Sequence, residues 1–293
     1  MLFEITHITD YVYGVVAAEA YIEARLQPIE RPGQQILKRK LVIAPNAATS
    51  IYTDFFGNTV EFFSLPYRHR KLTITNQFTV RTKKQKLPDD ALDVTVQEAR
   101  QLLGSSLADI FDYLQPTETV KVNKEAVQWA RRCLPGKTTI RTALETLNKA
   151  IYEGFEYRKG STDNSTPLAT IWREKKGVCQ DFAHVMLSIL RTAGLPARYV
   201  CGYIDAFPGE DDSRLVGAMA THAWVEVLLP GQTWVALDPT NDQWCGDRHI
   251  AVSFGRDFRD AAPLRGTFKG SGGQSLKARV FVKKFPAEKA PRK

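Results

Sequence analysis

Residues 177–196 read Gly177-Val-Cys179-Gln-Asp-Phe-Ala-His-Val-Met-Leu-Ser-Ile-Leu-Arg-Thr-Ala-Gly194-Leu-Pro196, and this is the most informative stretch of the 293-residue chain. Its apolar residues recur at spacings of three and four, which predicts a helix of about four turns with one buried face. These residues are Phe182, Val185, Met186, Ile189 and Leu190. Gly194 stands where a glycine cap ends a helix, and Pro196 follows it. The helix therefore begins at about Cys179.

The position of Cys179 in the first helical turn favours a reactive thiol. The first backbone N–H groups of a helix have no partner within it, and the helix dipole is positive at this end. Both effects favour a thiolate, the nucleophilic form of cysteine, and the same N–H groups could stabilise an oxyanion. The alternative is that Cys179 is a small buried apolar side chain. A catalytic cysteine also requires a base, which has to come from elsewhere in the chain.

A hairpin further along the chain supplies a histidine and a carboxylate. Alternating segments flank the loop 230–232, and a three-residue loop pairs Leu229 with Thr233. In this register His222 is the diagonal neighbour of Asp238 on one face of the sheet, with Cβ atoms ~7–8 Å apart and within reach of a hydrogen bond. A two-residue loop would place the two side chains on opposite faces, so the register is a definite prediction.

The chain order Cys179, His222, Asp238 fits a nucleophile, a general base and a carboxylate that orients the base. His184 is a competing base, but it lies about 180° around the helix from the apolar face that carries Cys179, so we expect it to be structural. The sequence identifies no partner for the other histidines, which are His7, His69 and His249.

A zinc site is the metal alternative for the same region. Its ligands would be Cys179, Cys201, His222 and Asp238, but no pair of them has the close spacing of a structural zinc knuckle. The four cysteines, at positions 133, 179, 201 and 245, also do not form a disulfide framework for a chain this long. We therefore expect free thiols, a reducing cytoplasm, and neither a metal nor a cofactor.

The regions around the helix and hairpin predict two domains. Residues 72–80 alternate between apolar and polar side chains, and Asp54-Phe-Phe-Gly-Asn58 has the composition of a hairpin turn. We expect an antiparallel β-sandwich-like domain over 1–82. A linker with short helices is expected over 83–116, and an α+β catalytic domain with a basic C-terminal strand and tail over 117–293. The helices are expected near 92–103, 122–133 and 141–154.

The composition is that of a globular protein, with 43% hydrophobic and 25% charged residues. The formal net charge of +8 is concentrated at the C-terminus, because residues 269–293 contain eight basic residues and one acidic residue. We expect these charges to be solvated, a polyanion contact being the alternative. No apolar stretch approaches the ~20 residues of a membrane span, and the first seven residues lack the features of a signal peptide. Membrane and nucleic-acid partners are therefore not expected.

Several separated motifs resemble the bacterial transglutaminase-like proteins, a family with members described as cysteine proteases. The motifs are the cysteine stretch, 196–203, Thr221-His-Ala-Trp-Val-Glu226, Trp234-Val-Ala-Leu-Asp-Pro-Thr240, the 54–58 turn, 155–157, 160–162 and 255–258. They occur in the family's order over nearly the whole chain. The resemblance implies a β-rich N-terminal domain and a papain-like α+β core.

The resemblance also implies that Cys179, His222 and Asp238 form a papain-like catalytic triad. In related enzymes an aromatic side chain is a second oxyanion donor, and Trp172 and Tyr157 are the candidates here. The chain has no acidic cluster like the calcium sites of the animal enzymes, so no metal is expected.

The chemistry expected of such a thiolate is attack on a peptide or carboxamide carbonyl, which gives a thioester and releases an amine or ammonia. With water as acceptor the enzyme is a protease or amidase, and with a lysine amine it is a crosslinking transglutaminase. The sequence favours hydrolysis because water is abundant and no device for excluding it is evident. A catalytically silent peptide-binding module is the non-enzyme alternative. The expected partner is a protein or peptide substrate, and the oligomeric state is not indicated.

Overall fold

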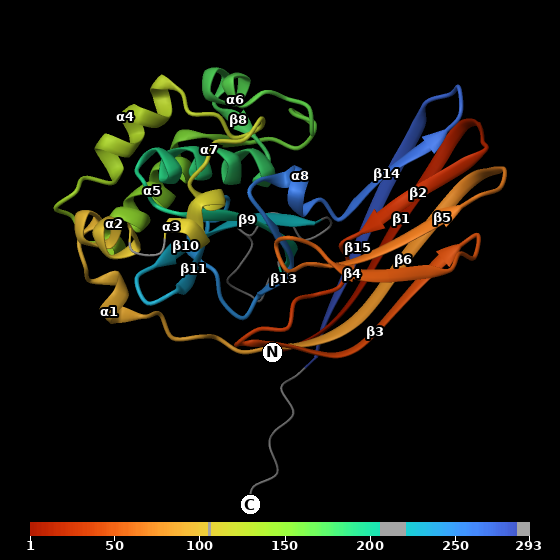
Figure 1. Ribbon diagram of the computed structural model, residues 1–293, viewed down its shortest axis with the longest axis horizontal. Coiled ribbons are helices and arrows are strands. Elements are labelled where there is room, and N and C mark those ends of the chain that lie inside the picture. The colour runs from red at the N-terminus through yellow and green to blue at the C-terminus, as the bar shows by residue number, and fades with distance from the viewer. Residues whose placement is uncertain (105–106, 206–220, 286–293) are drawn as a thin grey trace, which may run out of the picture.

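The computed structural model describes residues 1–104, 107–205 and 221–285, which form a β-sandwich beside an α+β core (Figure 1). The first sheet of the sandwich has the strand order β15-β1-β6-β3, and the second has the order β14-β2-β5-β4. The strands of the first sheet are β15 (Gln274–Phe285), β1 (Leu2–Ala17), β6 (His69–Thr82) and β3 (Gln34–Ala44). Those of the second are β14 (Leu264–Lys269), β2 (Glu19–Ala24), β5 (Thr59–Leu65) and β4 (Thr49–Thr53). All the pairings within these sheets are antiparallel.

The alternation along β6 produces the sandwich core, as expected from the sequence. Leu72, Ile74, Phe78 and Val80 are buried, and the residues between them are exposed or half-buried, apart from Asn76. Leu72 and Ile74 pack in one cluster with Phe63 and Leu65 of the opposite sheet. The antiparallel β-sandwich predicted for the N-terminal region is therefore confirmed.

The assignment of the C-terminal strand to the catalytic domain is wrong. β15 pairs with β1 along twelve positions, from Leu2 opposite Phe285 to Tyr13 opposite Gln274, and β14 pairs with β2. β1 therefore lies inside its sheet and requires a partner on each side. Periodicity indicates that 274–285 is a strand, but not which strand it pairs with, because the pairing joins opposite ends of the chain.

The three predicted helices are present to within a few residues, at 96–104, 124–133 and 140–154, and four further short elements accompany them. The helical elements between the sandwich and the core are α1 (Asp89–Leu92), α2 (Val96–Gly104), α3 (Leu107–Ile110), the 3₁₀ helix η1 (Phe111–Tyr113), α4 (Lys124–Cys133), α5 (Ile140–Gly154) and α6 (Leu168–Glu174). Asn123 and Thr139 cap α4 and α5 by accepting hydrogen bonds from backbone N–H groups in the first turn.

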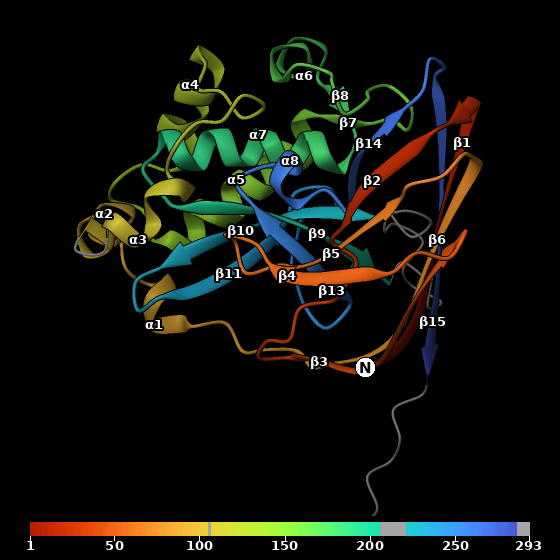
Figure 2. The same ribbon diagram turned by 45° about the vertical axis from the view of Figure 1, so that its right-hand side comes forward.

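The core consists of a five-stranded antiparallel sheet of order β12-β11-β10-β9-β13, with α7 (Cys179–Thr192) across one face (Figure 2). The strands are β9 (Ala197–Ile204), β10 (His222–Leu229), β11 (Thr233–Asp238), β12 (Gln243–Trp244) and β13 (His249–Gly255). The apolar face of α7 packs on alternate strand residues such as Val225 and Leu237. Gly194 follows α7 with a φ of +74°, as expected of a glycine cap. The short helix α8 (Phe258–Ala261) follows β13.

The sandwich and the core are in direct contact. Phe3 and Val80 of the first sheet pack in one cluster with Tyr203 of β9 and Val252 of β13. The amide of Asn58, in the 54–58 turn, bonds both backbone groups of Phe254. Among the described residues, no helix is both long and apolar enough to cross a membrane.

Candidate active site

The start of α7 is built by a short parallel strand pair and a glycine. β7 (Glu156–Tyr157) pairs with β8 (Lys176–Gly177), which leads directly into α7. Asp181 reaches back over the first turn and accepts a 2.8 Å hydrogen bond from the Val178 N–H. A Cβ on Gly177 would lie 2.7 Å from the Asp181 carboxylate, so this position needs glycine. Cys179 follows as the first residue of α7, and its side chain is half-buried.

Asp181 also holds a neighbouring loop against the helix start. Its Oδ2 accepts a 2.6 Å hydrogen bond from the Thr162 hydroxyl, in the 160–162 motif. Burial raises the pKa of Asp181, although the hydrogen bonds from Thr162 and Val178 oppose the shift. The carboxyl thus connects two of the motifs that the sequence analysis singled out.

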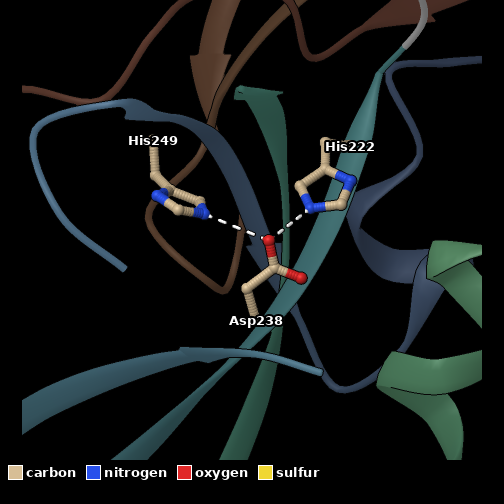
Figure 3. A group of neighbouring side chains, drawn as sticks. All are labelled: His222, Asp238 and His249. Carbon is tan, nitrogen blue, oxygen red and sulfur yellow. Dashed lines mark hydrogen bonds and ion pairs between the residues drawn. The ribbon is translucent and has the colours of Figure 1, made fainter. Parts of the chain in front are cut away.

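The predicted hairpin register is confirmed. Leu229 lies opposite Thr233 and Val225 opposite Leu237, as a three-residue loop requires. This register brings the side chains of His222 and Asp238 together across the sheet (Figure 3), with 2.8 Å between His222 Nε2 and Asp238 Oδ2. Both side chains are fully buried.

Asp238 accepts four hydrogen bonds from described residues, which is the behaviour of an ionised carboxylate. Oδ1 accepts from the Thr240 N–H at 3.0 Å, and Oδ2 interacts with Asn241 Nδ2 at 2.7 Å and with His249 Nε2 at 3.2 Å, in addition to His222. Burial alone would raise the pKa of Asp238. The charge and hydrogen bond of His222 outweigh burial, with help from His249, and the pKa is far below its usual range.

His222 has the opposite shift. Burial alone would lower its pKa, but the charge and hydrogen bond of Asp238, followed by the contribution of Cys179, raise the pKa to about 10. The imidazolium is therefore the favoured form at neutral pH. The second ring nitrogen, Nδ1, is buried and has no hydrogen-bond partner of good geometry among the described residues. Since Nε2 is engaged by Asp238, Nδ1 is the nitrogen available to the proton of the Cys179 thiol.

A glycine on the strand between the two histidines makes this arrangement possible. Gly202 of β9 lies opposite His222 on one side and Ala251 of β13 on the other. A Cβ at this position would lie 2.1 Å from the Ile250 carbonyl oxygen and 2.5 Å from the Trp224 ring. Gly202 therefore gives the Trp224 ring its place beside His222 and His249, with whose rings it is in contact.

His222, Asp238 and His249 also form the one set of three potential metal ligands found among the described residues, with donor atoms within 4.8 Å of one another. Two imidazoles and a carboxylate are acceptable ligands for several divalent metals. Here, however, each donor atom is already in a hydrogen bond within the group, and Asn241 adds another to Asp238. The same three side chains therefore form a hydrogen-bonded network in this structure.

The two aromatic candidates for an oxyanion donor have different surroundings. Tyr157 pairs with Gly177, immediately before the cysteine turn. Burial raises the pKa of Tyr157 to about 12, and the charges of Cys179, Asp181 and Asp238 act in the same direction. Trp172 instead lies in an aromatic cluster with Trp129 and Phe155, and Lys175 Nζ is 4.6 Å from its ring centroid. Its Nε1 is buried without a partner in the described part of the chain.

The other histidines form hydrogen bonds that do not involve Asp238. His184 is buried and accepts a hydrogen bond from the Phe258 N–H, and burial lowers its pKa to about 4. His7 contacts the Tyr203 hydroxyl, and His69 contacts the carbonyl of Tyr67. The four cysteines all lie in the described part of the chain and are free thiols. Sequence reasoning missed one member of the site, His249, because it considered neighbours on one hairpin only.

Comparisons with known proteins define the class of protein. The profile of the transglutaminase-like superfamily matches residues 127–239, and that of the bacterial transglutaminase-like N-terminal region matches residues 3–81. An uncharacterised protein of Mycobacterium tuberculosis strain H37Rv is 36% identical over 274 residues, which are 90% of this chain and 86% of that protein. An uncharacterised protein of Mycobacterium leprae is 32% identical over 286 residues, 95% of this chain and 97% of that one. The chain belongs to the bacterial transglutaminase-like family.

Two further matches are a short sequence match and a structural match over nearly the whole chain. A Pseudomonas aeruginosa protein named protein-glutamine gamma-glutamyltransferase is 40% identical over 67 residues, which are 22% of this chain and 10% of that protein. A crystal structure described as "a Putative Cysteine Protease from Cytophaga hutchinsonii" has a TM-score of 0.72 at 20% identity and covers 98% of this chain and 92% of that chain. The fold likeness therefore extends over both domains.

Proposed function

We propose that the protein is a cysteine-dependent acyl-transfer enzyme that acts on peptide or carboxamide bonds, with Cys179 as nucleophile, His222 as acid and base, and Asp238 as the residue that orients His222. The buried hydrogen bond between His222 and Asp238 carries this proposal. It keeps His222 protonated, and the Cys179 thiol at the start of α7 contributes to the same shift. A thiolate beside an imidazolium is the reactive state of a cysteine nucleophile.

The first half of the reaction forms a thioester. The Cys179 thiolate attacks the carbonyl carbon, and the oxygen becomes an oxyanion beside the N–H groups at the start of α7. His222 then gives its Nδ1 proton to the leaving nitrogen as the C–N bond breaks, which releases an amine or ammonia. Asp238 remains ionised throughout and holds Nε2 of the same ring.

The second half returns the enzyme to its starting state. Neutral His222 takes a proton from the acceptor as the acceptor attacks the thioester carbon. The C–S bond breaks, and the thiolate and imidazolium form again. When the acceptor is water, the product is a carboxylic acid, so the reaction is a hydrolysis.

We assign the second oxyanion donor to Tyr157 in preference to Trp172. The phenol of Tyr157 responds to the charges of both Cys179 and Asp238, and its high pKa keeps the O–H available as a donor. The indole of Trp172 is enclosed among other rings. The oxyanion then has two kinds of hydrogen-bond donor, which are the backbone N–H groups at the start of α7 and the Tyr157 O–H of β7.

We favour a protease or amidase over a crosslinking enzyme. Cys179 is half-buried, so solvent water has access to a thioester formed there. The likeness to the Cytophaga hutchinsonii structure shows a shared fold, and its description names a protease. The crosslinking alternative rests on the short match to the Pseudomonas aeruginosa glutamyltransferase. We place the enzyme in the cytoplasm, because free thiols are typical of a reducing compartment.

The test is the rate of alkylation of each cysteine by a small haloacetamide as a function of pH, followed by mass spectrometry. We expect Cys179 to react rapidly at about pH 6, because a histidine-paired thiolate persists at mildly acidic pH. The other cysteines serve as internal references, since burial raises the pKa of Cys201 to about 12 and that of Cys245 well above its ordinary value.

The control is His222→Gln, which removes the titrating ring and retains a polar side chain. It should lose the rapid reaction of Cys179 at about pH 6 and retain ordinary thiol reactivity at alkaline pH. Equal, slow reaction of Cys179 and the reference cysteines in the parent protein would contradict the proposal and favour a peptide-binding module. With peptide substrates, release of new amino termini or free ammonia supports hydrolysis, whereas incorporation of a primary amine supports crosslinking.

A further inference from the structure

His249 makes the third side-chain hydrogen bond to the same oxygen of Asp238. It is the first residue of β13, an edge strand that is separated from β10 by β9. Its Nε2 lies 3.2 Å from Asp238 Oδ2, on the side of the carboxylate away from His222 (Figure 3). The side chain is 3% exposed. The proposed reaction does not use this histidine.

The hydrogen bonds of His249 indicate its tautomer. The Gly246 N–H donates to Nδ1 at 3.3 Å, so Nδ1 is an acceptor and carries no proton. The proton of the neutral ring is then on Nε2, which donates to Asp238. The ring makes a T-shaped contact with Trp224, at a centroid distance of 5.3 Å and an angle of 76°. Both ring nitrogens and the ring itself thus have neighbours.

The two histidines on Asp238 carry different charges. The groups acting on His249 are Asp238, which favours the imidazolium, and His222 and Arg248, which oppose it. Burial, the largest effect, also disfavours the charge, and the pKa of His249 is lowered. His222 is the protonated member of the pair, and its ring centroid lies 6.3 Å from that of His249. The Asp238 carboxylate therefore balances the charge of the His222 imidazolium and accepts a hydrogen bond from the neutral ring of His249 on its other side.

We infer that His249 is a positioning residue that fixes the Asp238 carboxylate, and through it the ring of His222, by donating its Nε2–H to Asp238 Oδ2. This inference rests on the proposed function and adds a fourth residue to the proposed triad. His249 touches neither the thiol nor the leaving group; it acts only through Asp238.

The physical reason is that a carboxylate group can rotate about its terminal torsion. The terminal torsion of an Asp side chain has a broad distribution, so a single hydrogen bond to His222 would not fix the carboxylate plane. Asn241 and the Thr240 N–H come from the turn that follows Asp238 and move with it. His249 comes from a different strand and ties Asp238 to the far side of the sheet, beyond β9. Among the described residues, His249 is the one that donates a hydrogen bond to the Asp238 carboxylate from outside this hairpin and turn.

The test compares parent protein, His249→Gln and His249→Leu by ¹⁵N NMR of selectively labelled histidines and by the alkylation rate of Cys179. Gln retains an N–H donor, whereas Leu has none. In His249→Leu, the titration midpoint of His222 should fall by at least about one pH unit, because a carboxylate bonded only within its own hairpin and turn is positioned less firmly and stabilises the imidazolium less. The alkylation rate at about pH 6 should fall roughly tenfold with it. His249→Gln should recover most of both losses.

The matched control is His7→Leu, which removes an equally buried histidine that bonds Tyr203 and Thr9 away from the site. It should leave the His222 midpoint unchanged. An unchanged or higher midpoint in His249→Leu would overturn the inference. If that variant does not fold, the parent spectrum decides: a proton on Nε2 of His249 supports the inference, and a proton on Nδ1 overturns it. Slow alkylation of Cys179 in the parent would instead be a failure of the proposed function alone.

Discussion

Two buried carboxylates in the core sheet each interact with two basic side chains, but the basic side chains differ. Asp238 has His222 and His249 as partners, at 2.8 and 3.2 Å. Glu226, four residues after His222 on β10, has Arg31 and Arg198. Both carboxylates are at most 2% exposed. They therefore experience similar burial, and what distinguishes them is whether their partners can release a proton.

The arginine partners make Glu226 a fixed link between the two domains. Arg31 lies in the N-terminal region, and its Nη1 is 2.5 Å from Glu226 Oε1. Arg198 of β9 donates to Oε2 from Nε at 2.8 Å and from Nη2 at 2.6 Å. Burial would raise the pKa of Glu226, but the two guanidinium charges lower it. Arginine does not titrate in the physiological range, so this cluster can bind the domains together but cannot transfer a proton.

A buried ion pair can take part in proton transfer only when one of its partners titrates. His222 can give up its proton and take it back, whereas Arg31 and Arg198 cannot. A third carboxylate, Asp10 on β1, extends the comparison to the surface. It contacts Lys71 at 3.1 Å and Arg279 at 2.6 Å, and these basic side chains are 60% and 43% exposed, whereas the Asp10 side chain is 12% exposed. The three sites separate the effect of partner type from that of burial.

The largest effect on stability is expected for Glu226→Gln, which leaves two arginine charges without their carboxylate. Breaking a buried ion pair by removing one partner costs about 3–5 kcal/mol. Urea denaturation measures the loss in the free energy of unfolding. At urea concentrations where the variant is folded, the alkylation rate of Cys179 should remain that of the parent.

The matched variant is Asp238→Asn, which makes the same chemical change in the histidine cluster. It should lower the alkylation rate of Cys179 far more than Glu226→Gln does. Equal effects of the two variants on that rate would mean that titratable partners do not distinguish the two sites.

The next effect is expected from pH and is spread over several pH units. His222 has a folded-state pKa of about 10, above its unfolded value of about 6.5, so its interaction with Asp238 contributes full stability below about pH 6.5. This contribution is lost as the pH rises towards 10, at up to about 1.4 kcal/mol per pH unit. The arginine cluster should contribute equally over that range, because Glu226 remains ionised and arginine remains protonated.

The measurement is the free energy of unfolding at several alkaline pH values, for Cys179→Ala and for Cys179→Ala with His222→Gln. Removing Cys179 from both proteins eliminates its own titration, and the other titrating groups are common to both. The free energy of unfolding that the protein gains by retaining His222 should decrease as the pH rises. Parallel curves would contradict a raised pKa for His222.

The smallest effect is expected at the surface. The pKa of Asp10 is lowered by the hydrogen bond from Thr73, with smaller contributions from Lys71 and Arg279. Exposed ion pairs of this kind contribute about 0–1 kcal/mol. Asp10→Asn should therefore change the free energy of unfolding by less than about 1 kcal/mol, and the change should shrink in high salt. A loss comparable to that of Glu226→Gln would show that β1 and β15 depend on this pair.

Much of the candidate site could be predicted because its parts are local in sequence. The spacing of Phe182, Val185 and Met186 indicates the helix, and Gly194 marks its end. The hairpin loop sets the pairing register, which brings His222 to Asp238. Both inferences use geometry within one element or one turn, where side-chain direction follows from residue spacing.

Residue spacing therefore predicts the main helices and strands, the faces they bury, and the chain order of the three residues proposed as nucleophile, base and carboxylate. The folded structure adds that β15 completes the N-terminal sheet, that Arg31 reaches Glu226, and that His249 of β13 bonds Asp238 of β11 although β10 and β9 lie between these strands. Each of these contacts joins elements that are distant in the chain or not adjacent in a sheet. Local periodicity determines which face of an element is buried, but the partner of that face is selected by competition among all the surfaces of the folded chain.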